Sequence, residues 1–240
     1  MRRLAVSTVF IVAVLHARSA HAGRTHFGWL YGTDMIPERG VELENWIVEE
    51  NKKGDAKSDE TSFWWGPVMA LTEHVEFAIS AEAADETGFV GFTRWGADVR
   101  YRPQSPDPID AGPFTTLFRL GAKRLIHDRD GVRGEADAVA SYNAGPAIIS
   151  VDLGAVYEHV PMAEEFEFRP GAGVSFRVVK DFRLGVETYS ELIAKGEGTS
   201  WLVVGPTASL THGRFWGAAT LGIGLFGIRD APRLTFGVAL

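Results

Sequence analysis

From residue 40 onward, apolar and polar residues alternate with a period of two along almost the whole chain. A period of two sends successive side chains to opposite faces of a strand, so the pattern predicts β-structure rather than helices. The alternating stretches run for about ten residues or more, whereas strands of soluble proteins usually have about five or six. A tilted strand of this length crosses a bilayer, so the pattern favours a membrane barrel.

Turn signals divide the alternating pattern into twelve predicted strands. Their ranges are 40–50, 61–71, 74–84, 89–101, 113–126, 134–145, 147–158, 165–178, 182–193, 200–211, 214–227 and 231–240. In the seventh range Val151 and Leu153 share one face, and Ser150 and Asp152 share the other. The polar faces also carry glycines and charges of both signs, which suits a wet or ion-paired lumen. The predicted fold is all-β, an antiparallel up-and-down transmembrane β-barrel of about twelve strands, with ten or fourteen as alternatives.

The start of the chain is typical of a cleaved signal peptide. Arg2 and Arg3 precede an uncharged, mostly apolar run over residues 4–15, and Ala-His-Ala at 20–22 forms a cleavage site. The run is too short to span a bilayer as a helix. We therefore expect export and cleavage before Gly23. The predicted parts are a signal peptide (1–22), a periplasmic or lumenal segment (23–39) and an outer-membrane barrel (40–240).

The connections predict the orientation of the barrel. An even strand count places both termini on the periplasmic side, where turns are short. Short turns at 72–73, 179–181 and 212–213 fit this side, and the longer stretches 51–60, 127–131 and 194–199 fit the outside. The long connection at 102–112 does not fit. Aromatic residues near strand ends predict interfacial girdles: Trp46, Trp64, Trp65, Trp95, Tyr101, Tyr157, Trp201, Phe215 and Trp216.

One segment carries a resemblance to a known family. The stretch from Tyr31 to Gly40, YGTDMIPERG, is followed by VELENW at 41–46. It resembles the opening of a family of uncharacterised proteobacterial outer-membrane barrels, with a Y-x-T-D/E-x-x-P-x-G segment and then W-E-L-E-Q-W. Val41 stands where the family has Trp, and Asn45 where it has Gln. The resemblance implies a transporter-like barrel and supplies no catalytic residue.

Composition excludes several classes of function. The chain has no cysteine, so disulfides, thiolate metal sites and cysteine nucleophiles are excluded. The net charge of −7 argues against nucleic-acid binding. Asp128-Arg129-Asp130-Gly131 lacks the further ligands of a calcium loop, so we interpret it as a polar turn. We expect neither a metal nor a cofactor.

The charged residues of the predicted inner faces are the candidate functional residues. They are Glu42, Glu44, Glu76, Arg94, Asp98, Arg100, Arg119, Lys123, Glu135, Asp137, Asp152, Arg169, Arg177 and Glu187. Basic residues gather on the fourth and fifth predicted strands, and acidic residues on the strands beside them. This arrangement predicts either a transverse field that favours charged or dipolar solutes or a salt-bridged interior that does not conduct.

The predicted function is a porin-like channel or transporter for small solutes. A closed structural or binding barrel is the alternative. A lipid-modifying membrane enzyme is a weaker one, because the candidate bases His74, His159 and His212 lie by turns and no nucleophile motif lies on a strand. The expected partners are outer-membrane lipid, the barrel assembly machinery during biogenesis and an unidentified small solute.

Overall fold

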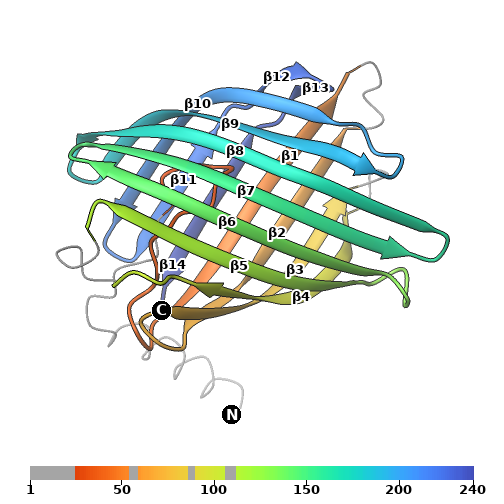
Figure 1. Cartoon of the computed structure of the whole chain (residues 1–240), viewed down its shortest axis with the longest axis horizontal. Helices are drawn as coiled ribbons and strands as arrows, with labels where there is room; N and C mark the ends of the chain where they lie inside the picture. Colours follow the sequence, from red (N-terminus) through yellow and green to blue (C-terminus); the bar gives the residue numbers. More distant parts are fainter. Residues whose placement is uncertain (1–24, 54–58, 86–89, 106–111) are drawn as a thin grey trace, which may run out of the picture.

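The structure, a computed structural model, describes residues 25–53, 59–85, 90–105 and 112–240. The predicted signal peptide, its cleavage site and parts of three connections lie outside the described residues. The described chain forms one antiparallel sheet that closes on itself (Figure 1). Its strands are β1 (Val41–Lys52), β2 (Glu60–Ala70), β3 (Val75–Asp85), β4 (Val90–Tyr101), β5 (Phe114–Leu125), β6 (Val132–Ala144), β7 (Ala147–Val160), β8 (Ala163–Val179), β9 (Phe182–Lys195), β10 (Trp201–His212), β11 (Phe215–Thr220), β12 (Ile223–Phe226), β13 (Ile228–Asp230) and β14 (Arg233–Ala239).

These fourteen segments occupy twelve strand positions around the barrel, as the sequence predicts. Strands β11 and β12 both pair with β10, so they form one strand of the barrel with a break in it. Strands β13 and β14 both pair with β1 and form another. The barrel closes where β14 pairs with β1 from Glu42 to Val48. The break between β13 and β14 includes Pro232, which has no backbone N–H to donate to a ladder.

The two faces of the sheet have the predicted orientation. On β7, Leu153 is 60% exposed on the outside, whereas Asp152 is 2% exposed on the inside. Large apolar side chains cover the outside, among them Ile79, Trp95, Val99, Phe118, Leu120, Ile149, Phe168, Val186, Leu210 and Leu225. An apolar surface of this extent needs hydrocarbon rather than water around it. The closed sheet satisfies the backbone of its strands without solvent.

Only some of the aromatic residues predicted to form the girdles face the outside of the barrel. Trp95, Tyr101, Tyr157 and Phe215 are exposed on the outside. Trp65 packs against Phe92, which is also exposed on the outside. The remaining four indoles point into the lumen: Trp64, Trp201 and Trp216 are buried, and Trp46 stacks on Trp64 with ring centroids 5.0 Å apart. Closeness to a strand end was the wrong criterion. Strand parity decides the face, and Trp46 follows Glu42 and Glu44 in steps of two.

The barrel has two ends, which differ in what surrounds them. The terminal mouth is the end at which β1 begins and β14 ends, and it carries two-residue turns at 145–146, 180–181 and 213–214. The loop mouth is the opposite end, with the β1–β2, β5–β6 and β9–β10 connections. We keep the prediction that the terminal mouth is periplasmic. None of the described residues forms a helix long and apolar enough to cross a bilayer.

Candidate functional site: the barrel lumen

The segment before β1 lies inside the barrel. Its tip, Gly28-Trp29-Leu30, donates three backbone N–H groups to the carboxylate of Glu187 on β9, at 2.7, 3.1 and 3.2 Å. The hydroxyl of Thr220 on β11 donates to the same carboxylate. Glu187 is 2% exposed. A buried carboxylate with four donors is satisfied without a basic partner, so Glu187 fixes the segment at the centre of the lumen.

Three further hydrogen bonds fasten the segment on its way to β1. The backbone N–H of Tyr31 donates to Asp152 (3.1 Å), and that of Ile36 donates to Glu76 (2.5 Å). The hydroxyls of Thr33 and Thr115 are 2.7 Å apart. Two of the acceptors, Asp152 and Glu76, are predicted lumen carboxylates that hold the backbone of the segment, and Glu76 also pairs with Arg100 at 3.7 Å.

Small residues on the inner wall make room for the segment. A Cβ at Gly171 would lie 2.3 Å from Leu30, and one at Gly173 would lie 2.5 Å from Phe27. Both glycines are on the inner face of β8. The alternation of small and charged residues there therefore serves to accommodate the segment.

Aromatic rings fill the space around the tip of the segment. Trp29 stacks on Tyr189 at 4.7 Å and meets Trp201 edge-on at 5.5 Å. Its Nε1 donates to the backbone oxygen of Ala231 (3.2 Å). Burial raises the pKa of the Tyr31 phenol well above its ordinary value, and the guanidinium of Arg119 lies 4.6 Å from the centre of that ring. These contacts make the segment part of the barrel core.

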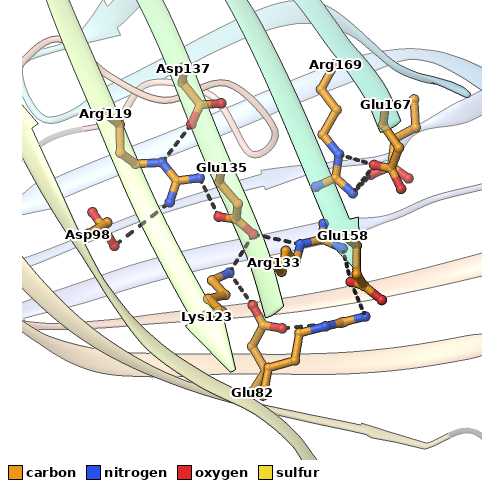
Figure 2. Close-up of polar contacts among 12 residues, drawn as sticks. Glu82, Asp98, Arg119, Lys123, Arg133, Glu135, Asp137, Glu158, Glu167 and Arg169 are labelled. Carbon is orange, nitrogen blue, oxygen red and sulfur yellow. Dashed lines mark hydrogen bonds and ion pairs between the residues drawn. The ribbon is translucent and has the colours of Figure 1, made fainter. Parts of the chain in front are cut away.

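A network of ion pairs joins the inner faces of β3 to β7 (Figure 2). At its centre Arg119 donates to Glu135 and Asp137, both at 2.7 Å. Glu135 also pairs with Lys123 at 2.9 Å and with Arg133 at 2.9 Å. The residues of each pair come mostly from neighbouring strands, which is the direct pairing expected when strands of opposite sign lie side by side.

The network continues toward the loop mouth. Arg133 pairs with Glu158 (3.0 Å), and Arg94 pairs with both Glu82 and Glu158 (3.4 and 3.3 Å). Lys123 also pairs with Glu82. Farther round the wall, Arg169 pairs with Glu167 and with Glu191 at 3.1 Å.

A second group of charges lies toward the terminal mouth. Arg100 donates to both carboxylate oxygens of Glu44, each at 2.8 Å, and to Asp98 at 3.1 Å. Glu42 beside it accepts a hydrogen bond from the indole of Trp216 (2.5 Å). The bidentate pair links β1 to β4 across β2 and β3, so it ties the wall together and narrows this end of the lumen.

Thirteen of the fourteen candidate residues lie on the inner face with buried or partly buried side chains. They are Glu42, Glu44, Glu76, Arg94, Asp98, Arg100, Arg119, Lys123, Glu135, Asp137, Asp152, Arg169 and Glu187. Arg177 is exposed near the terminal end of β8. Arg133, Glu167, Glu191 and Arg233 also face the lumen but were not among the candidates. Their strand parity would have revealed them.

The described residues enclose a large and a small cavity in the lumen. The vestibule has a volume of 490 Å³ and is lined by Trp29 and Tyr31 of the segment together with eleven carboxyl groups and seven basic side chains. It lies on the loop-mouth side of the segment, because Glu50, Lys52, Glu60 and Glu197 also line it. The inner cavity has 40 Å³ and is lined by residues 28–32 together with Asp34, Glu44, Glu76, Arg100, Arg233 and Thr235, among others. The segment thus lies between a large space with a charged wall and a small one.

The described residues contain no group of three or more His, Asp or Glu side chains placed to hold a metal ion. The three histidines considered as bases have other contacts. His74 Nδ1 lies 2.9 Å from the backbone oxygen of Arg102, His159 lies 3.8 Å from Glu164, and His212 lies 3.2 Å from Asp181. All three are at strand ends or turns.

No protein-family model matches the chain, and a search of curated proteins finds no relative. The resemblance of residues 31–46 therefore stays a prediction. Solved structures do match. The chain has the fold of bacterial outer-membrane β-barrels.

Three solved structures illustrate the match. An outer-membrane channel from Pseudomonas putida F1 has a TM-score of 0.61 at 10% identity, over 88% of this chain and 99% of that chain. The KdgM porin in complex with disordered oligogalacturonate has a TM-score of 0.53 at 9% identity, over 84% and 99%. The β-domain of the Bordetella autotransporter BrkA has a TM-score of 0.52 at 11% identity, over 84% and 99%. At such identities the likeness concerns the fold.

Proposed function

We propose that the protein is a porin-like outer-membrane channel for small solutes, with the N-terminal segment as its constriction. The observation that carries the proposal is the vestibule, a 490 Å³ space with a charged wall that ends on Trp29 and Tyr31. Two barrels of similar fold are a channel and a porin. A polar space of this size inside a closed membrane barrel suits the passage of hydrated small molecules.

The constriction follows from how the segment is held. Residues 25–36 are joined to the wall by hydrogen bonds to side chains and by ring packing and are not a strand of the sheet. Arg39 and Gly40, next to β1, form backbone hydrogen bonds with Ala70 of β2. The barrel wall keeps all its strand pairings if the segment shifts. Movement of the segment would connect the vestibule to the terminal mouth.

A closed barrel is the second candidate, and a specific observation favours it. Ion pairs link the inner faces of neighbouring strands, and Arg119 alone contacts three carboxylates. Such a network stiffens the wall and leaves few charges to attract a solute. The two candidates differ in whether current flows through the purified protein.

Single-channel recording in planar bilayers separates them. Because the chain has no cysteine, the variant T33C/T115C can lock the segment to β5 by a disulfide, at a site where the two hydroxyls are 2.7 Å apart. We expect the wild type to conduct, the oxidised variant to conduct less, and reduction to restore the current. The single variant T115C controls for the substitution. Silence of the wild type and of the reduced variant would support the closed barrel.

A further inference from the structure

Arg233 is a buried cation at the boundary between the two cavities. It is the first residue of β14, points inward, is 8% exposed and lines both the vestibule and the inner cavity. Its guanidinium lies 4.0 Å from the ring centre of Trp46 and 4.8 Å from that of Trp29. The wall and the N-terminal segment thus hold the cation between two aromatic rings.

Arg233 differs from its neighbours because the described chain gives it no counter-ion. Arg100, Arg119 and Arg133 each pair with at least two carboxylates. Within the described ranges, no carboxylate oxygen lies within the 4.0 Å of an ion pair from Arg233. The Nε of Arg233 is buried without a hydrogen-bond partner.

Asp152 lines the vestibule with Arg233; its Oδ2 accepts from the backbone N–H of Tyr31, its Oδ1 has no hydrogen-bond partner, and among the described residues it forms no ion pair with Arg233. Two other carboxylates in this part of the lumen are held by other partners. Glu187 is saturated by three backbone N–H groups and the hydroxyl of Thr220. Glu191 pairs with Arg169. Neither can neutralise Arg233 without giving up contacts that hold the segment or the wall.

A second group beside Arg233 also lacks a partner. Thr235 lies two residues farther along the inner face of β14, and its Oγ1 is buried without a hydrogen bond. It lines the inner cavity together with Arg233. A space of 40 Å³ is about three times the roughly 10–15 Å³ that one water needs. It therefore has room for about three heavy atoms, the size of a carboxylate group.

We propose that Arg233 and Thr235 form a subsite for the carboxylate group of a small solute that enters from the vestibule. A buried guanidinium without a counter-ion is costly, and its planar fork matches two carboxylate oxygens. The Thr235 hydroxyl supplies a further donor. The inference rests on the proposed channel only for the route by which the solute arrives.

The wall of the vestibule sets the expected strength of binding. Carboxyl groups outnumber basic side chains there, eleven to seven, so the vestibule does not concentrate free anions. Binding of a carboxylate then depends on the single desolvated guanidinium of Arg233, and we expect acetate to bind at millimolar concentration. Trp29 and Trp46 lie against Arg233 and serve as fluorescent reporters.

The test is a titration of the refolded full-length barrel with acetate, followed by tryptophan fluorescence, with uncharged acetamide as the matched probe. We expect a saturable change with acetate and none with acetamide. R233Q should weaken acetate binding about tenfold or more, because it removes a charge-assisted pair of hydrogen bonds. R233K keeps the charge and should show an intermediate loss. Heat-modifiable gel mobility establishes that each variant is folded.

R94Q is the control, because it removes the same charge from an arginine of the vestibule that already pairs with Glu82 and Glu158. It should bind acetate like the wild type. Equal binding by R233Q and the wild type, or no acetate response in the wild type, would overturn the subsite. The assay does not require current. Acetate binding by a barrel that carries no current supports the subsite and refutes the channel. A barrel that conducts but does not bind acetate supports the channel and refutes the subsite.

Discussion

Replacing Glu187 with alanine should release the tip of the N-terminal segment and widen the lumen. The substitution removes the acceptor of three backbone N–H groups, at 2.7, 3.1 and 3.2 Å. A hydrogen bond to a charged group contributes about 1.5–3 kcal/mol. Part of the loss is recovered when the freed groups bind water, so we expect the docked tip to be destabilised by about 3–6 kcal/mol. That range lowers the ratio of docked to undocked tip by roughly a hundredfold or more.

Two measurements report the release. Single-channel conductance in planar bilayers should rise, because the vestibule and the terminal mouth become joined. Quenching of tryptophan fluorescence by acrylamide should increase, since Trp29 is only 4% exposed in the docked state. E158A is the matched control. Glu158 also faces the lumen, but it pairs with Arg94 and Arg133, and both arginines retain a second carboxylate.

The reasoning fails if E187A conducts and is quenched like E158A. Such a result would mean that ring packing around Trp29 holds the tip without the carboxylate. Gain of conductance in both variants would instead attribute the effect to lumen charge in general.

Three further predictions concern the barrel itself. L153R should lower the stability of the refolded barrel by about 2–4 kcal/mol in urea titrations, because Leu153 faces lipid. L153F should be near neutral. Equal stability of the two variants would mean that residue 153 faces the lumen and that the two faces of the sheet are assigned the wrong way round. R119A should cost about 3–5 kcal/mol by leaving Asp98, Glu135 and Asp137 with fewer partners, and the double variant R119M/D137N should recover part of that loss. Deleting residues 235–240 should prevent formation of a protease-resistant, heat-modifiable barrel, because β14 closes the sheet against β1 and β11; a resistant truncated barrel would show that closure does not need β14.

The strands and their faces could be predicted from the sequence because the period of two is a local property. On β8, Phe166, Phe168 and Val174 alternate with glycines and charged residues, and no tertiary contact is needed to see which set is apolar. A shift by one residue would turn every side chain to the wrong face, so the pattern also fixes the register approximately. The twelve strands of the barrel follow from counting these repeats between turns.

The partners of the lumen residues could not be predicted in the same way. Glu44 and Arg100 are 56 positions apart, and only closure of the barrel brings them within 2.8 Å. Closeness to a strand end predicts the lipid interface for Trp46, Trp64 and Trp201, but an aromatic ring at a strand end suits either side of the wall. Strand parity puts them on the inner face, but their packing against Trp29 and Tyr31 of the N-terminal segment comes only from the closed barrel.

The N-terminal segment shows most clearly what the sequence determines and what only the tertiary structure decides. The sequence left residues 23–39 either in the lumen or in the periplasm, because they lack the alternation that assigns a face. Tertiary structure places the part from residue 25 in the lumen, where the carboxylate of Glu187 meets three N–H groups that are 157 to 159 positions away. Periodicity specifies a strand by itself, but a buried backbone can be satisfied only by groups that the closed barrel brings to it.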